Sequence, residues 1–80
     1  MEETVLKILM ELNEEILTYK GDNLYRDGLL DSFQVIDLAA ELEEKLGIEI
    51  DPEMVILENF ANKDAILGFV KKAMEEQDAG

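Results

Sequence analysis

Apolar side chains recur with a helical period along three stretches of the chain. In the first stretch they stand at spacings of three and four residues, while Glu11 and Glu14 fall between them. This spacing places the apolar residues on one face of a helix, which we expect over residues 3–19. Gly21 suits the left-handed conformation just past a helix end. The residues of this apolar face are Val5, Ile8, Leu9, Leu12 and Ile16.

A second apolar stripe predicts a helix over residues 32–46, with Gly47 ready to end it. Its start is signalled by Asp31 as N-cap and Gln34 at the third helical position, the two members of a capping box. Leu30 and Val35 occupy the two positions of a hydrophobic staple, which places Ser32 at the first helical position. The stripe consists of Val35, Leu38, Ala39, Leu42 and Leu46.

The segments on either side of this second helix are irregular. Residues 22–28 are rich in turn formers, and we expect Leu24 and Tyr25 to anchor an ordered loop to the core. Residues 48–50 alternate like a strand, but the chain offers no second strand to pair with them. We therefore expect an extended tether after Gly47.

The C-terminal part predicts one short and one long helix. An N-cap acid followed by Pro52 predicts a short helix over residues 52–58, and Asn62 is placed to cap the last one. Ile66, Phe69, Val70 and Ala73 form the apolar face of this last helix. Gly68 within it indicates either a tolerated glycine or the close approach of a neighbouring helix.

These patterns predict an all-α fold, a small four-helix bundle of three longer helices and one short helix. We expect a single domain over residues 1–80, with residues 76–80 forming a frayed tail.

The composition favours a folded acidic protein. Leu, Ile, Val and Phe supply 26 of 80 residues, well above the level of about one fifth that is typical of disorder. With 20 acidic and 7 basic side chains, the net charge of -13 repels nucleic acid and anionic lipid and favours basic protein surfaces. No apolar run approaches the roughly 18 residues that span a bilayer, and no signal peptide is apparent, so we expect a cytoplasmic monomer.

The residue types in the chain argue against a catalytic site and against a metal site. The chain has no His and no Cys, so a serine nucleophile lacks its usual base and thiolate metal sites are excluded. A calcium loop read from Asp22 fails because Leu24 and Arg26 stand where oxygen ligands are required. The sequence therefore predicts a protein that is not an enzyme and has no metal site.

Ser32 is the most informative residue, because the first turn of a helix presents free backbone N–H groups and the positive end of the helix dipole. A phosphate attached there is electrostatically favoured. The alternative is that Ser32 only caps the helix.

Residues 28–38, GLLDSFQVIDL, resemble the attachment motif of the acyl carrier protein family, in which an Asp-Ser pair is followed by a hydrophobic residue and later by an acid. The expected elements also follow the family's order over nearly the whole chain, including the Gly-Ile-x-Ile tether. The resemblance implies that Ser32 receives 4'-phosphopantetheine from coenzyme A and that the thiol of this arm carries an acyl or aminoacyl thioester. It also implies that Asp31 supports the magnesium ion of the phosphopantetheinyl transferase, a role compatible with capping.

Phe33 departs from the leucine that is commonest in carriers of fatty acid synthesis, and the string LLDSF is similar to D-alanyl carrier proteins and some stand-alone carriers. The cargo therefore stays open among D-alanyl transfer, polyketide or peptide assembly, and fatty acid biosynthesis.

The second helix of this family docks on basic patches of a loading ligase or synthase. We expect the partner-binding face to comprise Phe33, Asp37, Glu41, Glu44, Met54 and Val55. Simple solvation of the acidic stripe is the alternative for its three carboxylates. The competing hypothesis for the whole chain is an acidic helical adaptor in which Ser32 acts only as a cap.

Overall fold

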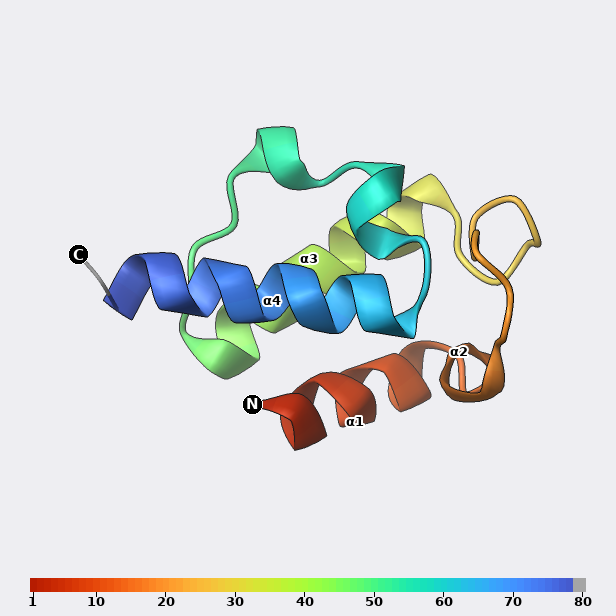
Figure 1. Cartoon of the computed structure of the whole chain (residues 1–80), viewed down its shortest axis with the longest axis horizontal. Coiled ribbons are helices and arrows are strands. Elements are labelled where there is room, and N and C mark those ends of the chain that lie inside the picture. The colour runs from red at the N-terminus through yellow and green to blue at the C-terminus, as the bar shows by residue number, and fades with distance from the viewer. Residues whose placement is uncertain (79–80) are drawn as a thin grey trace.

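The computed structural model describes residues 1–78, and within this range every regular element is a helix. The α-helices are α1 (Glu2–Leu12), α2 (Glu15–Thr18), α3 (Ser32–Leu46) and α4 (Lys63–Asp78). Two 3-10 turns, η1 (Pro52–Met54) and η2 (Leu57–Phe60), lie between α3 and α4. Figure 1 shows α4 crossing in front of α3, α1 along one side, and the α3–α4 connection looping round the opposite side. The all-α fold class predicted from the sequence is confirmed.

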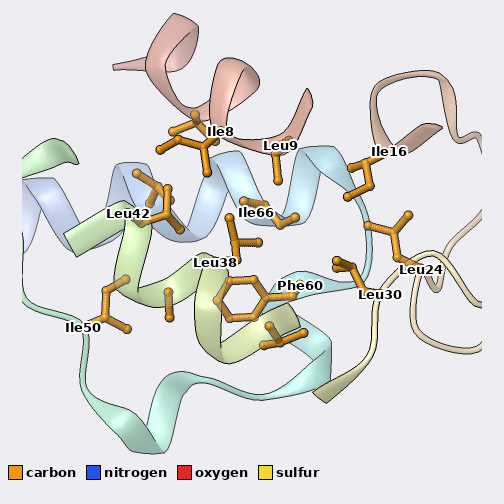
Figure 2. Packing of buried hydrophobic residues seen from close by; sticks show 14 of the residues in the cluster. Ile8, Leu9, Ile16, Leu24, Leu30, Leu38, Leu42, Ile50, Phe60 and Ile66 are labelled. Carbon is orange, nitrogen blue, oxygen red and sulfur yellow. The ribbon is translucent and has the colours of Figure 1, made fainter. Parts of the chain in front are cut away.

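A single cluster of apolar side chains joins these elements. Phe60 of η2 lies within the cluster beside α3, close to Leu38 in the view of Figure 2. Ile8 and Leu9 reach the cluster from α1, and Ile66 reaches it from α4. The buried residues are Val5, Ile8, Leu9, Ile16, Leu24, Leu30, Val35, Leu38, Ala39, Leu42, Ile48, Ile50, Phe60, Ile66 and Val70.

The expected first helix over residues 3–19 is interrupted, and in this respect the prediction was wrong. Asn13 adopts an extended conformation with φ -166° and ψ 107°, and its side-chain oxygen accepts the Glu15 N–H at 3.0 Å. Its side-chain amide also donates to the Leu29 carbonyl at 3.3 Å. Asn side chains compete for backbone groups in this way, which is why they favour helix ends. Ile16 is nevertheless fully buried in α2.

The loop between α2 and α3 is attached to the core by Leu24, as expected. The Leu24 side chain is fully buried, its N–H donates to the Ala61 carbonyl at 2.7 Å, and its own carbonyl accepts the N–H of Leu29 at 2.9 Å. Tyr25, expected as a second anchor, is exposed instead. The left-handed glycine of this region is Gly28, with φ 82°, and not Gly21.

Polar side chains order the surface of the same loop. The Tyr19 hydroxyl donates to the Asp27 carboxylate and accepts the Asn23 N–H, while Arg26 pairs with Asp22 and Asp27. The hydrogen bonds from Tyr19 and Arg26 lower the pKa of Asp27. These contacts hold the exposed side of the loop while Leu24 holds the buried side.

The predicted tether over residues 48–50 is extended, and side chains take the place of a neighbouring strand. Gln77 of α4 accepts the Glu49 N–H at 2.9 Å and donates to the Glu49 carbonyl at 3.0 Å. Glu43 of α3 accepts the Ile50 N–H at 2.9 Å. Both backbone groups of Glu49 and the N–H of Ile50 are therefore satisfied without a sheet.

The predicted short helix over residues 52–58 is replaced by η1 and η2. Asp51 accepts the Glu53 N–H as expected of an N-cap, but Val55 leaves the helical region with φ -82° and ψ 70°. Two separate turns allow Val55 to pack against the core while Phe60 becomes fully buried. The predicted helix was therefore right in its start and wrong in its continuation.

The last helix begins as predicted, because the Asn62 side chain accepts the Ala65 N–H at 2.8 Å. No atom outside the helix backbone lies within 4 Å of the position that a Cβ on Gly68 would take. Of the two alternatives left open by the sequence, the structure therefore favours the tolerated glycine over the close approach of a helix. The helix continues to Asp78, which makes residues 76–78 of the expected frayed tail helical. The rest of that tail lies outside the described residues.

Candidate functional site

The start of α3 is fixed by the capping box that the sequence predicts. Asp31 accepts the Gln34 N–H at 2.8 Å, and the Gln34 side chain accepts the Asp31 N–H at 3.0 Å. Leu30 and Val35, the expected staple residues, are both buried in the core. At the other end, Gly47 adopts the left-handed conformation with φ 65°. Ser32 is therefore the first residue of a helix whose two ends are both held.

Ser32 itself is exposed and is the only serine of the 80-residue chain. The capping hydrogen bonds are made by Asp31 and Gln34 and do not use its hydroxyl. The N-cap of α3 is therefore Asp31, and the alternative that Ser32 caps the helix was wrong. The hydroxyl is thus free for chemistry that the fold does not require.

The electrostatic surroundings of Ser32 favour an attached phosphate. The first four N–H groups of a helix lack acceptors within the helix, and here Gln34 and Val35 donate to the Asp31 side chain and carbonyl. The N–H groups of Ser32 and Phe33 remain directed toward the N-terminal end of α3, together with the positive end of its dipole. A phosphodiester on the Ser32 hydroxyl would meet this favourable field.

A groove of about 350 Å³ opens beside Ser32 and is otherwise lined by apolar side chains, those of Val35, Ile36, Val55 and Ile56. A serine nucleophile needs an adjacent base, and none of these lining residues can act as one. The geometry therefore suits a serine that accepts a group, and the groove offers apolar contact to whatever approaches it.

On α3 and on the connection that follows it, the protein exposes four large apolar side chains. Phe33 is 78% exposed and Ile36 60% exposed on α3, while Met54 and Ile56 are 41% and 44% exposed on the connection that follows. We call these four residues the apolar ridge. Phe33, Met54 and Val55 were expected at the partner-binding face; the first two are exposed and Val55 is half-buried.

Ile36 and Ile56 were missed by the sequence analysis. Ile36 could have been found, because it lies one helical turn after Ser32 and Phe33 and falls outside the stripe of core residues. Ile56 gave no such signal, since the expected helix over residues 52–58 did not fix which of its side chains face outward.

The expected acidic stripe lies on a different side of α3. Asp37, Glu41 and Glu44 are all exposed and line a separate groove between α3 and α1, which also contains Glu11. The structure therefore divides the expected partner-binding face into an apolar part next to Ser32 and an acidic part next to α1.

Among the residues that the structure describes, no helix combines the length and the apolar character needed to cross a membrane.

Comparison with known proteins identifies the family of the chain. The family model described as a phosphopantetheine attachment site matches residues 3–62, a range that contains α3 and its capping box. The D-alanyl carrier protein of Abiotrophia defectiva is 36% identical over 74 residues, which cover 90% of this chain and 94% of the relative. The D-alanyl carrier protein of Listeria welshimeri is 34% identical over 67 residues, covering 81% of this chain and 86% of the relative.

A third relative, D-alanyl carrier protein 2 of Lactiplantibacillus plantarum, is 44% identical over 48 residues, which cover 59% of this chain and 60% of the relative. No solved structure matches the chain significantly.

Proposed function

The chain belongs to the phosphopantetheine attachment family, and we propose that Ser32 is the residue that receives the arm and that D-alanyl is its cargo. The protein is a carrier and not an enzyme: it bears covalent 4'-phosphopantetheine, and partner enzymes act on the group that the arm presents. The bound arm supplies a terminal thiol that holds the cargo as a thioester.

The observation that carries the assignment of Ser32 is its place at the start of α3. It is the only serine, its side chain is exposed, and the helix is capped by Asp31 and not by Ser32. In the attachment step its hydroxyl oxygen forms a bond to the pantetheine-linked phosphorus of coenzyme A. The pyrophosphate bond breaks, adenosine 3',5'-bisphosphate leaves, and the hydroxyl proton passes to a base of the transferase. The chain contributes the oxygen and the favourable helix end.

Asp31 supports this step in two compatible ways. Its capping hydrogen bond to Gln34 fixes the first turn of α3 and hence the direction of the Ser32 side chain. Its carboxylate is also exposed, so it is accessible to a magnesium ion held by the transferase.

D-alanyl cargo is supported by the relatives, which are named D-alanyl carrier proteins, and by the string LLDSF around Ser32. A small aminoacyl group also needs no enclosed cavity, which suits the shallow apolar groove beside Ser32. The partners that follow are a phosphopantetheinyl transferase and a ligase that loads D-alanine.

We place two contacts for these partners on the surface. Ile36 and Ile56 of the apolar ridge line the groove beside Ser32 together with Val55, so the ridge provides the contact nearest the reacting oxygen. Asp37, Glu41 and Glu44 provide a second, acidic contact for a basic patch.

The test of the proposed function measures intact mass in two steps. The chain is first incubated with coenzyme A, Mg²⁺ and a phosphopantetheinyl transferase, and then with ATP, the ligase that loads D-alanyl carrier proteins, and either D-alanine or L-alanine. We expect the mass of one arm in the first step and of one D-alanyl group in the second, with release by hydroxylamine as a thioester requires. An arm that accepts fatty acyl groups and not D-alanine would contradict the cargo. A wild-type chain that stays unmodified with several transferases would favour the acidic adaptor.

Changing Ile36 to glutamate should lower kcat/KM for the transferase by about tenfold or more. The side chain is largely exposed beside the Ser32 groove, and burying such a group against a partner contributes roughly 1.5–3 kcal/mol, which the charged replacement forfeits. Met10→Glu is the matched control, because Met10 is a 49% exposed apolar residue on α1 and the charge change is the same. Equal kcat/KM values of the transferase for the two variants would contradict the proposal that the apolar ridge contacts this enzyme.

A further inference from the structure

A second apolar groove lies between α3 and the connection that leads from α3 to α4. It has a volume of about 430 Å³ and adjoins the groove beside Ser32, because Ile36 and Val55 line both. We call the two adjoining grooves the apolar track. Besides the two shared residues, the second groove is lined by Ala39, Ala40, Glu43, Ile50 and Pro52.

Glu43 is the one charged residue that lines the apolar track. It is half-buried on α3, and its Oε2 atom accepts the Ile50 N–H at 2.9 Å. A carboxylate can accept about four hydrogen bonds, so this contact leaves it able to bind a donor in the track. Within residues 1–78, the ion pairs closer than 4 Å are those of Arg26, and neither lysine nor arginine lines the track. The track therefore ends at a carboxylate that no cation of the described chain neutralises.

The position of Glu43 matches the reach of a group that is attached to Ser32. Glu43 follows Ser32 by eleven residues, which is about 16 Å along the axis of α3. An extended chain advances roughly 1.2 Å per bond, so the roughly 14 bonds from the Ser32 oxygen to the sulfur of the arm span about 17 Å. The nitrogen of an alanyl group on that sulfur lies roughly three bonds further along. The arm is therefore long enough to bring this nitrogen to Glu43.

We propose that Glu43 binds the ammonium group of the D-alanyl cargo while the arm lies along the apolar track. The apolar residues of the track contact the uncharged part of the arm, and the carboxylate at the far end is complementary to the cation. This inference rests on the proposed function, because only an aminoacyl arm on Ser32 brings an ammonium group to this carboxylate. Glu43 is thereby assigned to the choice of cargo, since a fatty acyl group has no cation for it to bind.

The deciding experiment compares two arms that differ only in the ammonium group. A phosphopantetheinyl transferase attaches either a D-alanyl or a propionyl arm to Ser32 from the corresponding acyl-coenzyme A. Backbone amide chemical shifts of the isotope-labelled chain are then measured at about pH 6.5, where an α-amino group is charged. The Ile50 N–H is the reporter, because it donates to Glu43 Oε2. We expect the D-alanyl arm to shift this amide resonance and the propionyl arm to leave it near its position with an unloaded arm.

Glu43→Gln tests the carboxylate itself. Glutamine keeps an oxygen that can accept the Ile50 N–H but has no charge for the ammonium group, so the difference between the two arms should be lost. Glu44→Gln is the matched control, because Glu44 is exposed on the same helix, carries the same charge and lines neither groove of the track. This control should keep the wild-type difference, and thermal melting establishes that both variants remain folded.

The rate of thioester hydrolysis gives a second measurement of the same contact. An ammonium group that is paired with a carboxylate attracts hydroxide less than a free one, so the D-alanyl thioester should hydrolyse about twofold more slowly on the wild type than on Glu43→Gln. The propionyl thioester should hydrolyse at the same rate on both chains.

Two results would overturn the inference while the carrier function stands. Equal shifts of the Ile50 amide by both arms would mean that the arm lies along the track without its ammonium group at Glu43. No shift by either arm would mean that the cargo stays in solvent. A wild-type chain that takes no arm from coenzyme A or its acyl forms would instead overturn the proposed function, and the inference would fall with it. Because both arms are attached without the ligase, rejection of D-alanine by the ligase would contradict the cargo separately.

Discussion

Replacing Ser32 with alanine is expected to abolish the coenzyme A-dependent increase in mass completely. The new phosphodiester bond uses the Ser32 oxygen, and the chain has no other serine to replace it. The fractional conversion, measured by intact mass after prolonged incubation, should fall from nearly complete in the wild type to undetectable. The hydroxyl of Thr18 is exposed as well, so Thr18→Ala serves as the control and should be modified at the wild-type rate.

The loss in Ser32→Ala cannot be ascribed to unfolding, because the fold does not use the hydroxyl. Asp31 and Gln34 make the capping hydrogen bonds of α3, and alanine has the highest helix propensity of all residues. The free energy of unfolding of the variant, measured with urea, should therefore stay within about 0.5 kcal/mol of the wild type, as for other surface changes. Residual modification of a folded Ser32→Ala chain would show that another residue accepts the arm.

The start of α3 could be predicted because all of its signals are local. Leu30, Asp31, Gln34 and Val35 stand within six residues; Asp31 and Gln34 cap one another, and Leu30 and Val35 are both buried. Hydrogen bonds and packing inside one helical turn do not depend on the rest of the fold. The position of Ser32 was accordingly predicted to the residue.

The parts that could not be predicted depend on contacts between distant segments. The first helix stops at Asn13 partly because its amide reaches the Leu29 carbonyl, sixteen residues away. Leu24 is fixed by the Ala61 carbonyl on the α3–α4 connection. Helical periodicity describes one element at a time, so neither of these two hydrogen bonds could be predicted from the spacing of apolar residues.

The division of the partner-binding face has the same origin. The resemblance to the family led us to expect Phe33, Asp37 and Met54 on one docking surface. Which side of α3 faces α1 and which faces the α3–α4 connection is decided by the packed core. The apolar and acidic contacts could therefore be separated only in three dimensions.

Phe60→Ala is the second change with a large expected effect, this time on stability. Phe60 is 1% exposed and lies within the core (Figure 2), where its ring meets Phe69 of α4 edge to face with centroids 5.4 Å apart. Removing a buried phenylalanine typically costs about 3–5 kcal/mol. A domain of this size has a total stability of roughly 4–12 kcal/mol. The loss is therefore between about a quarter and the whole of the total stability, and urea unfolding should show a strongly lowered midpoint or a chain that no longer folds.

Phe33→Ala is the matched control for this change, since it deletes the same atoms from a ring that is 78% exposed. Its free energy of unfolding should change by less than about 0.5 kcal/mol. Phe60→Leu, which keeps most of the buried volume, should fold with a loss below about 1.5 kcal/mol and so gives a measurable value even if Phe60→Ala does not fold. Equal costs for Phe60→Ala and Phe33→Ala would contradict the place of Phe60 in the core.

The two phenylalanines should also separate folding from partner binding. Phe60 lies just before Ala61, whose carbonyl accepts the Leu24 N–H, so its loss loosens both the α3–α4 connection and the loop that leads to Ser32. Phe33 belongs to the apolar ridge, so Phe33→Ala should keep its urea midpoint and lose transferase kcat/KM. Phe60→Leu should show the reverse, with a lower midpoint and near-normal kinetics well below it. These opposite effects would establish that the exposed Phe33 on α3 serves partner binding, whereas the buried Phe60 serves the stability of the core.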